Sequence, residues 1–308
     1  MNNITEELLH EITDWDGIFD GAYSLREDGQ CVDMHSSQNI RIVPKTDKPG
    51  IDIYISSKAQ KEAVYIPACV THGSVKDLVY NDFHIQSGAD VTIVAGCGVH
   101  TDSDEGVLHN GIHRFFLEPD SHVIYKEKHI GSGSGAGQRI IDPVTEAELG
   151  AGSILEMETL QLQGVDKTLR KTNAKLDRKA RLIIHESILT DNENDAETDF
   201  KVSMDGEDSS VDLISRSVAK GNSIQKYHSR IIGNCRCTGH SECDAILVGN
   251  GRVNAAPELY AGDIDASLIH EAAIGKIAGE QIIKLRTLGL TEEEAENKII
   301  EGFLTAVE

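Results

Sequence analysis

Short alternations of apolar and polar residues fill most of the chain from about residue 22 onward. Clusters of Gly, Asp, Asn or Lys separate them. The clearest examples are IRIVP (40–44), DIYIS (52–56), AVYIPA (63–68), DFHIQ (82–86) and DVTIVAG (90–96). A period of two places successive side chains on opposite faces of a strand. The pattern therefore predicts a mainly β protein built of many short strands.

The alternating segments recur at a nearly constant distance along the chain. Their turn residues begin at positions 88, 119, 150, 178, 208 and 240, so successive units lie 31, 31, 28, 30 and 32 residues apart. A repeat of about 30 residues is typical of solenoids. It predicts a parallel β-helix core over residues 25–261. A large β-sandwich is the alternative, but it gives no reason for so regular a period.

Helical periodicity is confined to the two ends of the chain. In residues 1–24, Ile4, Leu8 and Ile12 are spaced for one short helix. Near the other end, an apolar series follows the helical period from Ile274 to Gly289, which is a suitable C-cap residue.

A second C-terminal helix is expected to begin at a capping box formed by Thr291 and Glu294. It carries Ala295, Ile299 and Phe303 as an apolar stripe. Residues 262–308 are thus expected to form a helical hairpin. Because two such helices cannot shield their own stripes, they are expected to pack on the solenoid end, on another protein, or on both.

Composition narrows the classes of partner and the compartment. The formal charge is −22, from 51 acidic and 29 basic residues, which disfavours nucleic acid and anionic membranes as partners. No apolar run approaches the roughly 20 residues that span a bilayer, and the first residues lack the basic and apolar regions of a signal peptide. A cytoplasmic location is expected. Six cysteines in such a chain point to thiol chemistry or metal binding rather than disulfides.

Three of the cysteines, Cys235, Cys237 and Cys243, fall within the short stretch NCRCTGHSECD. If the first two lie in a strand, the period of two puts both thiols on one face. Cys243 would lie beside them if its own strand stacks on theirs. His270 and Glu271 follow at the apparent start of a helix. Thiolates gathered in this way suit zinc, copper(I) or an iron–sulfur cluster, and a Glu or His would make the site labile.

Two simpler interpretations compete with a ligand set. The Cys-x-Cys pair is also compatible with two ordinary half-buried thiols. A structural zinc knuckle, with His240 as fourth ligand, would be expected to show paired Cys-x₂₋₄-Cys or His-x₃₋₅-His spacings. Only a single Cys-x-Cys is present, and a lone loop His is more often solvent-facing.

The remaining cysteines and the glycine-rich segment carry weaker patterns. Cys97, with His100 and His109 nearby, is compatible with sulfur delivery or with plain burial. Cys69 and His72 are spaced as a second metal pair, although a buried Cys beside a loop His is the simpler interpretation. No pattern involves Cys31. GSGSGAG lacks the Gly-Lys-Ser/Thr ending of a Walker loop, so ATP hydrolysis is expected in a partner.

Four segments together resemble the SufB/SufD family of iron–sulfur cluster assembly proteins. They are SRSVAKGNSIQKYHSRI (215–231), ECDAILVGN (242–250), residues 267–304 and GCGVHTDSDEGVLHNGI (96–112). The resemblance covers the C-terminal hundred residues well and the solenoid more loosely. It implies a right-handed parallel β-helix whose C-terminal helices dock a SufC-like ABC ATPase, and a dimeric core on which a cluster is built.

The resemblance also assigns site residues. Cys243, His270 and Glu271 match positions associated with cluster assembly in the SufB branch, whereas SufD proteins keep the His and lack this Glu. The chain is therefore expected to be a short SufB-like form without the long N-terminal region of SufB. One such subunit would serve the roles of both SufB and SufD. Ile269 replaces a commonly acidic residue, and GNGRVNAAP lacks a Cys that often follows the Gly-Asp turn. In compensation, Cys235 and Cys237 supply two further thiols one coil away.

The resulting hypothesis is a scaffold subunit and not an enzyme. It would bind a nascent [4Fe-4S] cluster transiently through Cys235, Cys237, Cys243 and Glu271, with His270 as the alternative fourth ligand. Expected partners are the SufC-like ATPase, a second copy in a homodimer that binds two ATPase subunits, iron and sulfur donors, and recipient apo-proteins.

The predicted ATPase-docking residues are Ala295, Ile299 and Phe303. The alternative function is a stand-alone metal-binding β-helix protein or metalloenzyme. Enzymes on this scaffold usually expose carboxylates and aromatic residues along one groove, but the single Trp, Trp15, lies outside the repeats.

Overall fold

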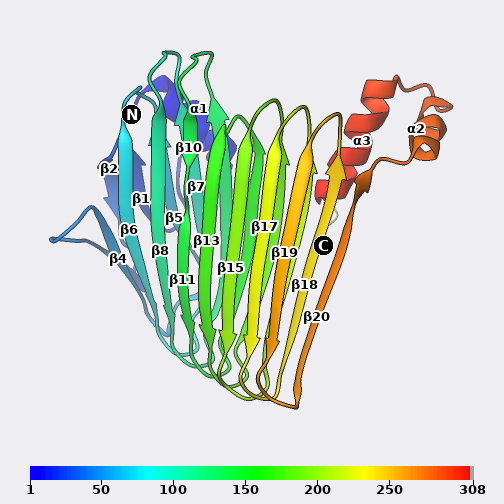
Figure 1. The fold of residues 1–308 in the computed structure, drawn as a ribbon. Helices are drawn as coiled ribbons and strands as arrows, with labels where there is room; N and C mark the ends of the chain where they lie inside the picture. The colour runs from blue at the N-terminus through cyan, green and yellow to red at the C-terminus, as the bar shows by residue number, and fades with distance from the viewer. Residues whose placement is uncertain (306–308) are drawn as a thin grey trace.

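Parallel strands wound into a two-sheet solenoid form most of the molecule in the computed structural model, which describes residues 1–305 (Figure 1). One sheet has the strand order β2-β1-β5-β7-β9-β12-β14-β16-β18-β20, and the other has the order β19-β17-β15-β13-β10-β8-β6-β4-β3. Strand β11 extends β10 and pairs with β8 and β13. Apart from two antiparallel hairpins at the N-terminal end, β1–β2 and β3–β4, all strand pairs are parallel. The predicted parallel β-helix is confirmed.

The first sheet contains β1 (Ala22–Glu27), β2 (Gln30–His35), β5 (Gln60–Val70), β7 (Asp90–His100), β9 (His122–Ser132), β12 (Ile154–Gln163), β14 (Arg181–Thr190), β16 (Ser209–Ala219), β18 (Cys237–Leu247) and β20 (Ala266–Lys276). The second contains β3 (Ile40–Pro44), β4 (Gly50–Ile55), β6 (Lys76–Ile85), β8 (Val107–Leu117), β10 (Arg139–Ile141), β11 (Val144–Leu149), β13 (Lys167–Leu176), β15 (Asp195–Met204), β17 (Ile224–Gly233) and β19 (Arg252–Ala261).

The core lies between the two sheets, where equivalent side chains from successive coils stack. Strand β8 alternates strictly between buried and half-buried positions, as the period of two requires. The rings of Phe83 and Phe115, both fully buried, stack with centroids 4.7 Å apart and planes 8° apart. Because each coil buries its inward face only against its neighbours, the fold needs the near-constant repeat seen in the sequence.

The predicted N-terminal helix is confirmed as α1 (Asn3–Thr13). Asn2 caps it, since its side-chain oxygen accepts a hydrogen bond of 2.8 Å from the backbone N–H of Thr5. The helix packs on the outer face of β7, where Gly96 and Gly98 allow close approach. A Cβ atom at Gly96 would lie 2.7 Å from Ile12, and one at Gly98 would lie 3.0 Å from Leu8.

The C-terminal hairpin is present, but it begins later than predicted. Strand β20 pairs in register with β18 and contains His270, Glu271 and Ile274, so the helical interpretation of those residues was wrong. The parallel strands thus continue past residue 261, where the sequence-based boundary was placed. The free edge of β18 offers a full row of hydrogen-bonding partners, which outweighs the local helical pattern. The first helix is only α2 (Gly279–Arg286).

The second helix, α3 (Glu292–Thr305), begins at the predicted capping box. The Thr291 backbone N–H donates to Glu294 over 2.7 Å, and the Glu294 N–H donates to the Thr291 hydroxyl over 3.2 Å. Of the packing partners expected for this helix, the solenoid is the one observed. Ala295 is fully buried, and Phe303 packs against the cluster that Ile300 and Leu304 form with the outer face of the solenoid.

Candidate metal centre

Cys237 and Cys243 both face the interior of the solenoid in β18. The buried positions of this strand alternate from Cys237 through Ser241 to Cys243. Along β20, Ser241 pairs with His270, and Cys243 pairs with Ala272. Register partners share a face of the sheet, so Cys243 and His270 lie on the inner face of adjacent strands at the last coil.

His270 has a ring nitrogen without a partner. Its Nδ1 atom is buried and makes no hydrogen bond to any of residues 1–305. A buried polar atom left unpaired costs free energy unless a ligand, an ion or a partner chain satisfies it. Among the residues that the sequence singled out around Cys243, this nitrogen is the one whose surroundings point to a missing ligand.

Glu271 does not join this pair. It is exposed and pairs in register with Glu242 on the outer face of the sheet. In a strand, adjacent residues point to opposite faces, so within one chain Glu271 points away from Cys243. The sequence-based assignment placed both residues in one site because it took Glu271 for the start of a helix.

The other two thiols lie at the far end of β18. Cys235 is half-buried in the turn before the strand, with its Sγ atom 3.5 Å from the carbonyl oxygen of Met204. Cys237 and Cys243 are six residues apart on one extended strand, which corresponds to about 20 Å. A single chain therefore does not bring the three thiols together as predicted. Cys237 and Cys243 lie on the same strand, whereas the prediction placed Cys243 on a second strand stacked on that of Cys235 and Cys237.

The thiols are protonated in the metal-free protein. Burial, followed by the charges of Glu186 and Asp244, raises the pKa of Cys243 to about 12. Burial also raises the pKa of Cys235 and Cys237. A metal ion must therefore displace a proton to bind any of them. The same raised pKa makes these thiols poor nucleophiles in the metal-free protein.

His240 does not complete a zinc site with the cysteines. It alternates with the inward residues of β18 and forms an ion pair of 2.8 Å with Asp212 on the outer face. The Cys69–His72 pair is also not formed as a site. Cys69 is buried beneath α1, and His72 pairs with Asp28 over 2.6 Å in a turn.

A second group of ionisable residues lies deep in the solenoid and was missed by the sequence analysis. Glu127 and His129 of β9, Arg170 of β13 and Glu186 of β14 are all at least 96% buried. Arg170 bridges the carboxylates, with Nη1 2.5 Å from Glu127 and Nε 3.3 Å from Glu186. Cys97 pairs in register with His129. The alternation of YKEKHI, which places Glu127 and His129 on one face, was the available signal.

His113 connects to this group through a relay of hydrogen bonds. Asn81 lies 3.3 Å from its Nε2, and the Tyr125 hydroxyl lies 2.7 Å from its Nδ1 and donates to Glu127 over 2.8 Å. Because the hydroxyl donates to Glu127, it accepts from the N–H at Nδ1, and the amide nitrogen of Asn81 donates to Nε2, so His113 is neutral. Complete burial lowers the pKa of His113 to about 4.

We expect acid to destabilise the protein through His113. Its pKa is about 4 in the folded state and 6.5 when unfolded, so the unfolded chain binds more protons between these values. The contribution of His113 to the free energy of unfolding is fully present above pH 6.5 and falls by about 3 kcal/mol as the pH drops to 4. Urea unfolding across pH 4–7 measures this loss. His113→Gln should flatten the profile, and an unchanged profile in that variant would contradict the assignment.

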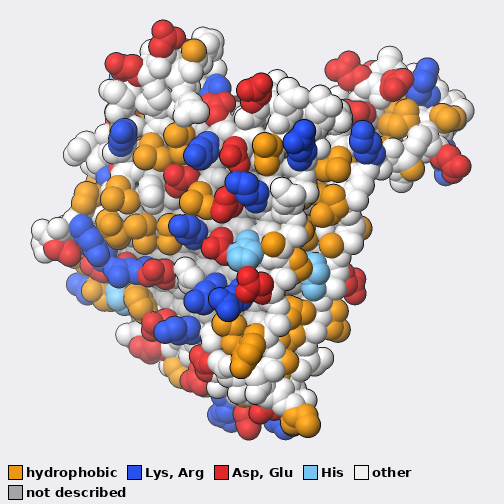
Figure 2. Space-filling view, viewed as in Figure 1, with side chains coloured by type: hydrophobic (Ala, Val, Ile, Leu, Met, Phe, Trp, Pro, Cys, Tyr) orange, Lys and Arg blue, Asp and Glu red, His pale blue; other side chains and the backbone are white. Residues whose placement is uncertain are grey.

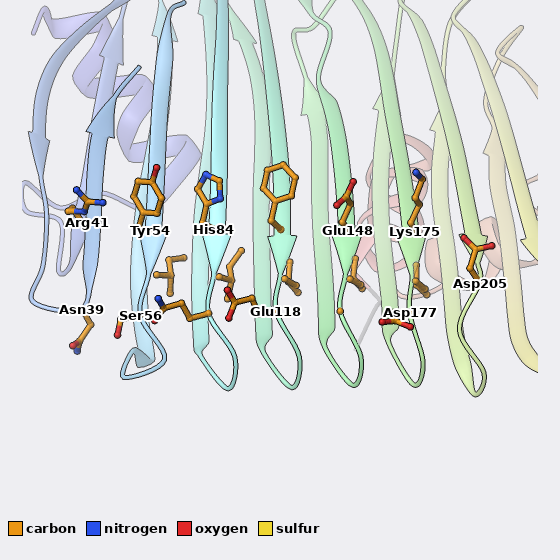
Figure 3. Close-up of a pocket in the computed structure, with 18 of the residues that line it drawn as sticks. Asn39, Arg41, Tyr54, Ser56, His84, Glu118, Glu148, Lys175, Asp177 and Asp205 are labelled. Atoms are coloured by element: carbon orange, nitrogen blue, oxygen red, sulfur yellow. The ribbon is translucent and has the colours of Figure 1, made fainter. Parts of the chain in front are cut away.

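A large surface hollow lies elsewhere, on the outer face of the second sheet (Figure 3). It has a volume of about 1020 Å³. Arg41, Tyr54, His84 and Phe116 form a row in register across β3, β4, β6 and β8. Ring centroids are 4.8 Å apart for Tyr54–His84 and 5.3 Å for His84–Phe116. The row and its flanking carboxylates correct the expectation that aromatic residues do not gather along a groove.

The acidic group beside this hollow is an ion-pair network. Asp52, Asp82 and His84 are close enough to hold a metal ion. However, Lys45 lies 2.6 Å from Asp52 and 2.8 Å from Asp82, and Arg114 pairs with Asp82 through two nitrogens. These cations already pair with the carboxylates, and none of the three side chains has a buried polar atom without a hydrogen-bond partner in the described chain, so nothing in this group points to a missing ion.

The fold is thus a β-solenoid whose last coil carries, on its inner face, a buried thiol and a buried imidazole nitrogen without a hydrogen-bond partner in the described chain. The family model of the SufBD core domain of the SUF system for FeS cluster assembly matches residues 79–303. The chain therefore belongs to the SufBD family.

Curated relatives agree with this assignment. An iron–sulfur cluster assembly SufBD family protein of Archaeoglobus fulgidus is 29% identical, with 79% of this chain and 65% of the relative covered. A SufBD family protein of Methanothermobacter thermautotrophicus is 27% identical, with 82% of this chain and 62% of the relative covered. This chain thus spans slightly less than two thirds of these relatives. A shorter one of Methanocaldococcus jannaschii is 24% identical, with 92% and 90% covered.

No helix within residues 1–305 has both the length and the apolar character needed to cross a bilayer. The longest, α3, has 14 residues, and it uses its apolar side to pack on the solenoid.

Proposed function

We propose that this chain is a scaffold subunit on which an iron–sulfur cluster is assembled and then released. The observation that carries the proposal is the pairing of strand β18, which carries Cys243, with strand β20, which carries the buried, unpartnered Nδ1 of His270, so that both side chains face the interior at the last coil. Thiolate and imidazole are both established ligands of iron–sulfur clusters. Membership in the SufBD family supplies the chemistry in which such ligands are used.

The cluster is cargo rather than a resident cofactor in this proposal. A site that mixes thiolate with imidazole or carboxylate holds a cluster less firmly than four thiolates do, which favours transfer to recipient apo-proteins. We propose a [4Fe-4S] cluster built from external iron and sulfur donors. The chain is then a scaffold rather than an enzyme, and its place is the cytoplasm.

One chain supplies too few ligands in one place, so we propose that a homodimer completes the site. Strands β19 and β20 end the two sheets, and neither has a further neighbour among residues 1–305. Their surroundings expose Leu259, Tyr260, Ile264 and Ile269, which are 40%, 60%, 98% and 53% accessible. Figure 2 shows apolar side chains along this edge. Long open edges with apolar side chains are templates for pairing with another chain.

Pairing of two copies at this end would place two Cys243–His270 pairs close to one interface. Glu271 on the outer face of β20 would be available to the neighbouring copy, and Cys235 and Cys237 remain a separate thiol pair. Analytical ultracentrifugation tests the dimer directly. A protein that stays monomeric at micromolar concentration, yet assembles a full cluster, would contradict the shared site.

The helical hairpin is the proposed docking site for a SufC-like ABC ATPase. Helix α2 has no buried residue, and Ile283 and Leu288 are 62% and 76% exposed. The predicted stripe of Ala295, Ile299 and Phe303 is covered in part by the solenoid, so α2 supplies the free apolar surface. Such a surface on a projecting hairpin fits a protein interface better than a core.

We expect Ile283→Glu to weaken ATPase binding by more than about 1 kcal/mol if the side chain is an interface anchor. Folding should be unaffected, because the side chain is exposed. Phe303→Ala is the matched control: it removes a ring packed on the solenoid and should lower thermal stability instead. Isothermal titration with the ATPase and thermal unfolding separate the two results. Equal binding by the Ile283 variant and wild type would exclude α2 from the interface.

The function itself is tested by anaerobic purification and reconstitution with ferrous iron and sulfide. Absorption and Mössbauer spectra should show a cluster, and incubation with an apo-ferredoxin should transfer it. Co-purification of an ABC ATPase separates the scaffold from the alternative of a stand-alone metalloenzyme. A reconstituted protein without a cluster, or with a cluster that no recipient can remove, would overturn the proposal.

A further inference from the structure

Three potential metal ligands converge in the interior of the solenoid, far from the last coil. The Sγ atom of Cys97, a carboxylate oxygen of Glu127 and a ring nitrogen of His129 all lie within 4.8 Å of one another. Cys97 in β7 pairs in register with His129 in β9, and Glu127 precedes His129 by two residues on the same inner face. Their exposed fractions are 4%, 3% and 0%.

An unpartnered nitrogen marks this cluster independently. The Nε2 atom of His129 is buried and forms no hydrogen bond within the described chain. Its nearest carboxylate oxygen, on Glu127, is 3.4 Å away. The other ring nitrogen, Nδ1, lies 3.2 Å from Arg170. A buried nitrogen without a hydrogen-bond partner costs free energy, which a ligand in the adjacent space would offset.

We propose that Cys97, Glu127 and His129 bind one divalent transition-metal ion of the borderline class that includes ferrous iron and zinc. Sulfur, nitrogen and oxygen ligands together suit this class better than calcium or magnesium, which prefer oxygen alone. Metal binding does not depend on the proposed function. The identity of the ion as ferrous iron does rest on it.

A small cavity borders the cluster on the side of Cys97. It has a volume of about 50 Å³, and Cys97, His109, His113 and Asn81 are among the residues that line it, whereas Glu127 and His129 are not. That space holds at least one water molecule, and three protein ligands with one water is a common arrangement for an exchangeable metal site. The cavity also reaches Cys31, which is exposed.

Neighbouring side chains hold the carboxylate in position. Tyr125 donates a hydrogen bond of 2.8 Å to one oxygen of Glu127, and Arg170 donates one of 2.5 Å to the other. Such contacts orient metal ligands in many proteins.

Arg170 also limits the affinity of the site. A guanidinium only donates hydrogen bonds, so in this structure Nδ1 of His129 accepts and the ring proton is on Nε2. Metal binding requires that proton to move to Nδ1 and the Cys97 thiol to lose its proton to solvent. Arg170 must then leave Nδ1, with Glu127 and Glu186, the latter 3.3 Å from its Nε, as the remaining partners. These costs favour an ion that exchanges.

The inner site is separate from the last coil. Strands β9, β12, β14 and β16 lie between β7 and β18 in the sheet. Five steps at the usual strand spacing correspond to about 24 Å. A single ion or cluster cannot contact both Cys97 and Cys243, so substitutions distinguish the two sites.

Cobalt(II) is the probe, added anaerobically to the full chain without sulfide. Wild-type protein should show a thiolate-to-cobalt absorption band. The part of the band that comes from the inner site should saturate when one cobalt ion is bound per chain. Cys97→Ser and His129→Gln should each abolish that band. Cys69→Ser is the control, because Cys69 is equally buried on the neighbouring strand β5 but faces α1. Cys69→Ser and Cys243→Ser should both retain the inner-site band.

The two proposals fail in different ways. A band that survives in Cys97→Ser and disappears in Cys243→Ser would overturn the inner site and leave the cluster site standing. Wild-type protein that binds no cobalt through a thiolate would also overturn it. X-ray absorption at the cobalt edge gives a second readout: one sulfur ligand with nitrogen and oxygen supports the site, and a sulfur-free shell contradicts it. Circular dichroism confirms that each variant is folded.

Discussion

Cys243→Ser should remove most of the iron that the protein binds on anaerobic reconstitution, together with the visible spectrum of the cluster. The thiol is 1% exposed on the inner face of the last coil and pairs across the sheet edge with the strand that carries His270. Serine keeps the size of the side chain but replaces a soft thiolate by a hard hydroxyl, which iron in a cluster binds weakly. Iron analysis and absorption spectra measure the effect.

Two controls make this result specific. Cys97→Ser should leave the visible cluster spectrum unchanged, because the inner site lies about 24 Å away. Joint substitution of Cys235 and Cys237 tests the thiol pair at the other end of β18. If the triple variant with Ser at 235, 237 and 243 keeps the same iron content and spectrum, the cluster is held elsewhere, and the surroundings of Cys97 become the next region to search.

Arg170→Met should lower the free energy of unfolding by about 3–5 kcal/mol, because it leaves two buried carboxylates without their counter-charge. Glu127 and Glu186 are 3% and 1% exposed, and both pair with this guanidinium. The proximity of His129 and the ion pair with Arg170 keep the pKa of Glu127 well below its usual range despite burial. The shift of the urea unfolding midpoint reports the loss.

Arg230→Met is the matched control for this experiment. Arg230 pairs with Glu258 over 3.2 Å, but the two side chains are 51% and 50% exposed. A surface pair of this kind contributes at most about 1 kcal/mol, since water screens both charges. Similar midpoint shifts for the two variants would show that the interior pair is not the stabilising element inferred here.

Local patterns in the sequence were sufficient for the elements whose interactions are local. The capping box at Thr291 and Glu294 forms as predicted because both of its hydrogen bonds join residues three apart. The N-terminal helix is likewise stabilised by its own cap at Asn2. The solenoid was predictable for a related reason: each coil repeats the same alternation, so the repeat length itself describes how one coil stacks on the next.

The candidate sites depended on contacts between distant residues. Residues 266–276 have a helical pattern but form β20, because the edge of β18 pairs with all of them. That pairing turns His270 inward and Glu271 outward, and it separates the predicted ligands. Likewise, α3 buries Ile300 and Leu304 against a solenoid surface that no local pattern describes.

The inner cluster shows the same division most clearly. The alternation of β9 determines that Glu127 and His129 share a face of that strand. The alternation of β7 determines on which face of its strand Cys97 lies. Only the parallel register between these strands places the three side chains together. Residues about 30 positions apart in the chain become neighbours because one full coil returns the backbone to the adjacent strand, a relation set by tertiary packing rather than by local propensity.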